Sequence, residues 1–183
     1  MPYNMSNEID HVLFTAEQLS ERVAQLCAQI TADYADNDVP PLVICILRGA
    51  ATFASDLVRA IDLPIEIDYM AISSYGAATR SSGILRIVKD LDTEIKDRDV
   101  IVIEDVLDSG LTLRYLSANL QARGVRSFEV ATLLCKRRTA AVDPRYVGFQ
   151  CPDEFVVGYG LDYNQKYRNL PYIGVLKPEL VEG

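Results

Sequence analysis

The chain has no tryptophan and only one histidine, His11, and its four cysteines form no CxxC or Cys/His cluster. Catalysis or metal binding that depends on histidine therefore has little support. Three of the cysteines lie in apolar segments, where cysteine acts as a small hydrophobic residue, so the cytosol is the simplest compartment. We expect His11, in a polar N-terminal region, to be solvated.

Long apolar segments and an excess of positive charge are also absent. No apolar run approaches the roughly 20 residues that a membrane-spanning helix needs, and the N-terminal region lacks the basic and apolar parts of a secretory signal. The formal net charge of −8 disfavours a general grip on nucleic acid or on an anionic membrane. We therefore expect neither as a partner, and a small anionic ligand would need a local basic pocket.

The composition fits a single globular domain over residues 1–183, because 49% of the residues are hydrophobic and can form a sizeable core. No internal repeat or interdomain linker divides the chain. Predicted strands cover about residues 42–47, 65–71, 84–88, 100–103, 128–134, 155–158 and 172–176, and predicted helices cover about 15–35, 51–61 and 111–123.

This alternation of strands and helices predicts an α/β fold with a mostly parallel sheet flanked by helices. The core would span about residues 40–143. The terminal segments, about 1–14 and 144–183, would form a small hood subdomain on that core, and we expect residues 144–155 to be irregular.

One stretch joins a predicted strand to a predicted helix through polar residues. Val100–Ile103 is apolar, Glu104 and Asp105 follow it, and Asp108–Thr112 contains hydroxyls and a glycine. A helix N-terminus offers unpaired N–H groups and a partial positive charge, which suit a phosphate. Glu104 and Asp105 are then placed to bind sugar hydroxyls or a metal. The alternative is an acidic turn in which Ser or Asp caps the helix.

Two other predicted strands end in basic residues. Arg48 and Gly49 follow the strand at 42–47, and Lys136 follows a later strand. Ligands of parallel α/β sheets collect at the carboxyl ends of the strands, so these residues are candidates for binding an anion. The alternative is that both basic side chains are merely solvated. The Ser- and Gly-rich segment 73–83 is expected to be a loop that closes over the site or a surface hairpin.

The segment Glu104–Thr112 resembles the phosphoribosyl-diphosphate-binding motif of type I phosphoribosyltransferases. It is not a Walker A loop, because it lacks Gly-Lys-Ser/Thr with the upstream glycine. Four further segments resemble the 6-oxopurine branch of that family, in the family's order: Leu47–Gly49, Ser74–Tyr75, Cys135–Arg137 and Phe155–Tyr163. The resemblance covers about residues 40–175 and implies the type I phosphoribosyltransferase fold.

This resemblance implies transfer of phosphoribose from 5-phosphoribosyl 1-diphosphate to a 6-oxopurine base, with Mg²⁺ as cofactor. The residues that it implies for phosphoribosyl-diphosphate binding are Leu47, Arg48, Gly49, Glu104, Asp105, Asp108, Ser109, Gly110, Leu111, Thr112 and Arg168. Within that set, 47–49 would form the diphosphate loop and 108–112 would wrap the 5′-phosphate. Mg²⁺ would be held by Glu104, Asp105 and Asp162.

On the base side, the resemblance implies contacts from four residues. Lys136 would hydrogen-bond the 6-oxo group, Phe155 would stack on the ring, and the Val156 backbone would read its edge, with Asp162 close by. Asp108 would be catalytic, because it would accept a proton from purine N7 as N9 attacks the sugar.

Four further points follow from the resemblance. Ser74 and Tyr75 would lie on the closing loop. Leu111 stands where relatives often carry Lys, and little is lost if backbone N–H groups hold the phosphate. Arg48 replaces the Lys of many relatives, keeping the charge with a different hydrogen-bond geometry. The family often has a non-proline cis peptide at Leu47–Arg48, and the sequence leaves that bond open.

Two competing functions are a transferase for xanthine or another base, and a regulator of the same fold that binds nucleic acid. Lys136 argues against adenine, whose amino group is a poor partner for a Lys donor. Retention of Asp108, Lys136 and Asp162 in an acidic chain disfavours the regulator. The sequence does not decide between hypoxanthine and guanine. By resemblance, we expect a homodimer or homotetramer.

Overall fold

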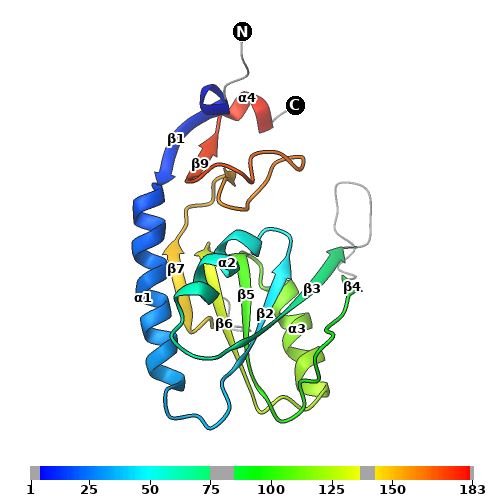
Figure 1. Ribbon diagram of the computed structural model, residues 1–183. Helices are drawn as coiled ribbons and strands as arrows, with labels where there is room; N and C mark the ends of the chain where they lie inside the picture. The colour runs from blue at the N-terminus through cyan, green and yellow to red at the C-terminus, as the bar shows by residue number, and fades with distance from the viewer. Residues whose placement is uncertain (1–4, 75–84, 137–142, 182–183) are drawn as a thin grey trace.

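A six-stranded sheet forms the core of the protein (Figure 1). The computed structural model describes residues 5–74, 85–136 and 143–181. The strand order is β4-β3-β2-β5-β6-β7; neighbours from β3 to β7 are parallel, and β4 is antiparallel at one edge. The bounds are β2 Leu42–Leu47, β3 Glu66–Ser74, β4 Leu85–Lys89, β5 Asp99–Leu107, β6 Ser127–Cys135 and β7 Tyr146–Gln150.

Helices cover both faces of this sheet. Helices α1 (Ala16–Tyr34) and α2 (Ala51–Ala60) pack on one face, and α3 (Leu111–Ala122) packs on the other. Neighbouring residues of β2 show the division, because Val43 belongs to the apolar cluster with α1 and α2 and Ile44 to the cluster with α3. Both are fully buried, which explains why this strand is apolar throughout.

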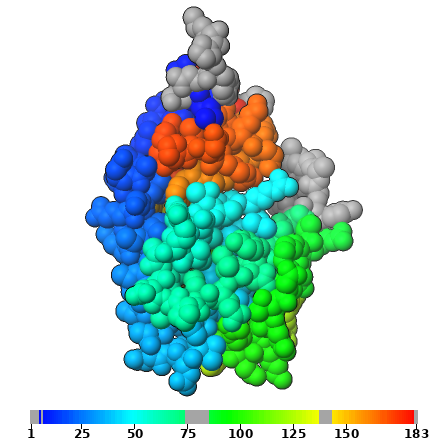
Figure 2. Space-filling model, viewed as in Figure 1, coloured from blue at the N-terminus to red at the C-terminus, as the bar shows by residue number. Residues whose placement is uncertain are grey.

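A second, three-stranded antiparallel sheet forms a hood on the core, in the order β1-β9-β8. Strand β1 (Ile9–Phe14) precedes the core in sequence, whereas β8 (Val156–Val157) and β9 (Ile173–Leu176) follow it. Two short helical segments, η1 (Met5–Glu8) and α4 (Pro178–Val181), complete the hood. Figure 2 shows the orange hood segment resting against the cyan residues around the start of α2.

The α/β fold, the mostly parallel sheet and the hood are confirmed. Thr15 caps α1 in a capping box with Gln18. The prediction that 144–155 is irregular is wrong over Tyr146–Gln150, because β7 pairs there with β6 and extends the core sheet past residue 143. No helix among the described residues is long and apolar enough to cross a lipid bilayer.

Strand β5 is longer than its prediction, and β3 buries a polar residue. Strand β5 continues to Leu107, so Glu104 and Asp105 lie within its carboxyl end and not after it. Strand β3 buries its polar Asp68 and leaves Tyr69 40% exposed. Asp68 is buried because two backbone N–H groups of the segment after β4 donate to its carboxylate.

Two other predictions concern single segments. His11 lies on β1 with 48% of its side chain exposed, and its Nδ1 is 2.8 Å from Asp10. The predicted closing loop starts where β3 ends, at Ser74. Tyr75 and the remainder of that loop lie outside the described residues.

The topology creates a crevice at the carboxyl ends of β2 and β5. From β2 the chain crosses to β3 on one side, and from β5 it crosses to β6 on the other, so the strand order reverses between these two strands. Loops that leave adjacent strands in opposite directions open a crevice between them, where α/β proteins bind ligands. The two segments singled out from the sequence, 47–49 and 104–112, lie on either side of that point.

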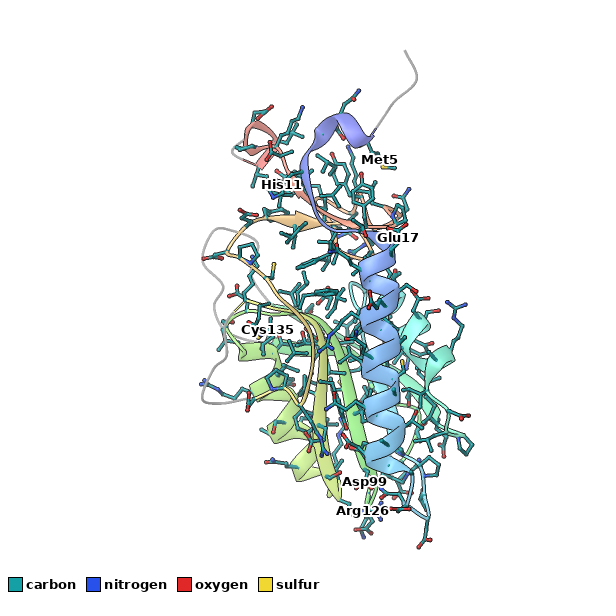
Figure 3. All side chains as sticks on the ribbon, turned by 90° about the vertical axis from the view of Figure 1, so that its left-hand side faces the viewer. Met5, His11, Glu17, Asp99, Arg126 and Cys135 are labelled. Atoms are coloured by element: carbon teal, nitrogen blue, oxygen red, sulfur yellow. The ribbon has the colours of Figure 1, made fainter. Side chains whose placement is uncertain are left out.

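The opposite edge of the sheet is held together by Asp99, the first residue of β5. Its carboxylate accepts hydrogen bonds from the side chains of Asn37 at 2.9 Å, Arg126 at 2.9 Å and Ser127 at 2.7 Å. One buried side chain thus joins the turn after α1 to the starts of β5 and β6; Figure 3 shows Asp99 and Arg126 together, away from the hood. The Arg126 hydrogen bond is the main cause that lowers the pKa of Asp99 below its usual value.

We predict that Asp99→Asn lowers the free energy of unfolding by about 1–3 kcal/mol at neutral pH, because an amide cannot accept from all three donors. The folded-state pKa of Asp99 is lowered, so its stabilisation is present above the unfolded pKa of about 3.9 and is lost as pH falls through the folded value. Urea unfolding should therefore show a smaller difference in the free energy of unfolding between the wild type and Asp99→Asn at acidic pH than at neutral pH. Asp97→Asn, at an exposed neighbour, is the control, and an equal loss in both variants would contradict the prediction.

Candidate active site

Two cavities lie at the crevice between β2 and β5. The residues that line a cavity of about 230 Å³ include Leu47, Arg48, Gly49, Glu104, Asp105 and Thr112. A cavity of about 90 Å³ is lined by Glu104 and residues 106–113. Because Glu104 and Thr112 line both, the structure brings the two predicted segments together. A larger cavity, about 680 Å³, lies between α1, α2 and the hood, and of the predicted site residues it includes Arg168 alone.

The smaller cavity lies at the N-terminus of α3. Gly110 is the N-cap residue, with φ 73°, and it brings no side chain to the helix end. Ser109 Oγ is 3.5 Å from the backbone N of Leu111, which is long for a hydrogen bond. The first N–H groups of a helix have no partner within it, so they and the helix dipole can bind a phosphate.

Glu104 and Asp105 form an acidic pair beside that helix end. Burial raises the pKa of Glu104 well above its usual value, and the adjacent Asp105 carboxylate adds to the rise. Burial also raises the pKa of Asp105, although the N–H of Val106 donates to its Oδ1 at 2.8 Å. Among the described residues, no hydrogen-bond partner reaches the buried Oε2 of Glu104. A cation would compensate this pair, because a buried carboxylate oxygen without a partner is costly.

Asp162, the predicted third metal ligand, is engaged elsewhere. Its Oδ1 lies 2.6 Å from Nη2 of Arg168, and its Oδ2 accepts the N–H of Gln165 at 2.8 Å. Over the described ranges, no three His, Cys, Asp or Glu side chains converge on one point. The donor set still fits Mg²⁺, which is usually held by one or two carboxylates together with substrate phosphates and water.

The loop after β2 packs directly on Asp105. A Cβ on residue 49 would lie 1.5 Å from Oδ2 of Asp105, so only glycine fits beside that carboxylate. A Cβ on Gly160, in the hood, would lie 2.3 Å from the carbonyl oxygen of Gly49. Gly49 is therefore enclosed between the acid of the core and the hood. The Leu47–Arg48 peptide bond before it is cis.

Arg48 and Arg168 share one acceptor at the junction of core and hood. Nη1 of Arg48 donates to Oε1 of Gln165 at 3.0 Å, and Nη2 of Arg168 donates to the same oxygen at 3.2 Å. Nη1 of Arg168 also donates to the carbonyl of Gly160 at 2.8 Å. Our sequence reasoning missed Gln165, and no local pattern marks it, because its contact with Arg48 spans 117 positions.

Asp108 and Lys136 are neighbours because β5 and β6 end together. Leu107 pairs with Cys135, and the N–H of Lys136 donates to the carbonyl of Leu107 at 2.9 Å. Figure 3 shows Cys135 at the end of the sheet that faces the hood. The Lys136 ammonium donates to the carbonyl of Glu154 at 2.8 Å, so the hood already contacts the side chain that we expect to bind the base.

The remaining base-side residues lie in the next positions of the hood. Phe155 is 43% exposed, and its ring stands edge-to-face with Tyr163 at 5.3 Å between centroids. Val156 begins β8 and pairs with Val175 of β9. An exposed aromatic face beside a fixed strand provides a stacking surface and a backbone edge at one place.

Comparisons with known proteins match nearly the whole chain. A family model described as a phosphoribosyl transferase domain matches residues 13–164. A hypoxanthine-guanine phosphoribosyltransferase of Bacillus subtilis (strain 168) is 48% identical over 181 residues, which cover 98% of this chain and 99% of the relative. A hypoxanthine-guanine phosphoribosyltransferase of Mycobacterium avium is 51% identical over 181 residues, which cover 96% of this chain and 89% of the relative. The crystal structure of a hypoxanthine phosphoribosyltransferase of Staphylococcus aureus has a TM-score of 0.91 at 48% identity, covering 98% of each chain.

We predict that Glu104→Gln raises the free energy of unfolding by about 1 kcal/mol at neutral pH while it weakens Mg²⁺-dependent binding, because the amide removes a buried charge. The folded-state pKa of Glu104 is raised, so the wild-type penalty is complete above that pKa and disappears as pH falls to the unfolded value. Urea unfolding at neutral and acidic pH measures this. Exposed Glu94→Gln is the control, and a Glu104→Gln variant less stable than wild type at neutral pH would refute the prediction.

Proposed function

The chain belongs to the phosphoribosyltransferase family and, within it, to the hypoxanthine-guanine branch, and from this premise we propose its reaction. It transfers 5-phosphoribose from 5-phosphoribosyl 1-diphosphate to N9 of hypoxanthine, and of guanine, and forms IMP or GMP and diphosphate in purine salvage. One observation carries this proposal beyond the similarity: the uncapped N-terminus of α3, the acidic pair and Lys136 all lie at one edge of one sheet.

The sugar phosphate is bound by the two segments at the crevice. The N–H groups at the start of α3, with the hydroxyls of Ser109 and Thr112, bind the 5′-phosphate. Glu104 and Asp105 bind the ribose hydroxyls and Mg²⁺, with Asp162 as a further candidate ligand. When bound there, Mg²⁺ would neutralise charge that develops on the departing diphosphate.

The diphosphate is bound by the loop 47–49 and by the positively charged side chains of two arginines. Arg48 comes from the core and Arg168 from the hood, so the leaving group sits between the two parts of the molecule. Breaking the bond from C1 of the sugar to diphosphate builds negative charge on the leaving oxygens. Guanidinium groups that are already positioned there stabilise this charge.

The base is bound on the Lys136 side of the crevice. Phe155 stacks on the ring, the Val156 backbone reads its edge, and the Lys136 ammonium donates to the 6-oxo group. Lys136 currently donates to the carbonyl of Glu154, which has the same chemistry as a 6-oxo group. A 6-oxopurine can therefore replace this partner, whereas the 6-amino group of adenine cannot.

We further propose a cytosolic location and a homodimer or homotetramer. None of the four cysteines forms a disulfide within the described residues, which suits a reducing compartment. The oligomer is expected from the family resemblance, and light scattering after gel filtration would measure it.

A steady-state assay with phosphoribosyl diphosphate, Mg²⁺ and a panel of hypoxanthine, guanine, xanthine, adenine and uracil tests the reaction. Turnover with hypoxanthine or guanine and none with adenine or uracil is the expected result. Preference for xanthine would support the transferase for another base. Absence of nucleotide synthesis together with salt-sensitive binding to RNA or DNA would support the regulator instead.

We predict that Asp108→Asn lowers kcat by about 10²- to 10⁴-fold, because an amide cannot accept the N7 proton as N9 attacks. The affinity for phosphoribosyl diphosphate should change far less, because backbone N–H groups and hydroxyls bind its 5′-phosphate and the charge of the Asp108 carboxylate is not needed there. Single-turnover rates and equilibrium binding separate the two effects. Near-normal turnover in this variant would remove Asp108 from the proposed role.

A further inference from the structure

Gln165 links the core and the hood at the place where the diphosphate is proposed to bind. Its Oε1 accepts one hydrogen bond from Arg48, which follows β2, and one from Arg168, which precedes β9. An amide oxygen has two lone pairs, so these two bonds use its full accepting capacity. One atom thus contacts two guanidinium groups, one from the core and one from the hood.

The backbone of the hood loop is arranged to present this side chain. Asn164 and Gln165 both have positive φ, 50° and 65°, in the left-handed region. Asparagine tolerates that region, whereas glutamine adopts it only under strain. The N–H of Gln165 donates to the carboxylate of Asp162. Tyr163 and Lys166, on either side of the two-residue turn, form an isolated antiparallel β-bridge. The turn therefore keeps Gln165 in a costly conformation that orients its side chain toward Arg48.

The chemistry of the side chain suits a holder of cations. A guanidinium carries five N–H donors, and Gln165 takes one from each arginine, which leaves donors for an anion. Arg168 already pairs with Asp162, and a second carboxylate is not required to fix its position.

We propose that Gln165 is a positioning residue for the diphosphate: it holds Arg48 and Arg168 at the spacing that binds the leaving group. This inference rests on the proposed function of the crevice. Gln165 acts through the two arginines and contacts no reacting atom. Its removal should therefore affect the diphosphate part of the site and leave the 5′-phosphate and base parts unchanged.

Gln165→Ala removes the shared acceptor. It should raise KM for phosphoribosyl diphosphate about tenfold, the effect of one hydrogen bond to a charged group, and leave kcat within about a factor of two. Calorimetry should show a similar loss in affinity for Mg²⁺ diphosphate and unchanged affinity for IMP. Gln165→Glu keeps an acceptor at the same place, so its KM should lie closer to that of the wild type than the KM of Gln165→Ala.

Asn164→Ala is the matched control, because it places alanine at a neighbouring exposed position with the same sign of φ. It should keep the wild-type KM. If the control and Gln165→Ala are equally impaired, or if IMP and diphosphate affinities fall together, the side chain has only a structural role and the inference fails. A wild-type protein that binds neither ligand and makes no nucleotide would instead refute the proposed function of the crevice.

Discussion

The close approach of the Asp105 carboxylate to Gly49 is the contact on which the rest of the site depends. A Cβ on residue 49 would lie 1.5 Å from Oδ2 of Asp105, so any side chain there would displace that carboxylate. The same glycine presents its carbonyl to Gly160 of the hood at a distance that excludes a side chain there too. Three segments from two sheets therefore meet through backbone and one carboxylate. The acid of β5, the loop after β2 and the hood are therefore in close contact at this point.

The charges of the site are divided in a way that suits a highly anionic substrate in an acidic protein. The net charge of −8 gives no general attraction for phosphates, so the attraction has to be local. It is supplied by the dipole at the start of α3 and by cations at the junction of core and hood. The partly buried acids Glu104 and Asp105 lie between these positive groups, and burial raises the pKa of each carboxyl. A site of this kind is stabilised by the ligands that it binds.

Much of the fold and part of the site could be predicted from the sequence, because their signals are local. The apolar run 42–47 indicates a strand buried on both faces, and Glu104–Thr112 carries acids, a glycine and hydroxyls at one strand end. Strand β7 was missed because Tyr146–Gln150 contains a glycine and lies between Asp143–Pro144 and Pro152–Asp153, so the whole segment has the composition of a loop. The faces of β3 could not be predicted, since Asp68 is buried by N–H donors from a distant segment.

The contacts of Gln165 and the fit of Gly49 were hidden for a related reason. Each depends on residues that are far apart in sequence and meet only when the hood rests on the core. A pattern along the chain can show which residues carry phosphate chemistry. It cannot show that a neutral residue, Gln165, accepts hydrogen bonds from both Arg48 and Arg168.

The pairing of β1 with β9 also fixes when the site can form as the protein is made. Strand β1 emerges from the ribosome before the core, and among the described residues its strand partner is β9, which emerges after all of it. The six strands of the core can assemble in the meantime, since domains fold during synthesis from the N-terminal side. The carboxyl ends of β2 and β5 can therefore come together before the strands of the hood pair.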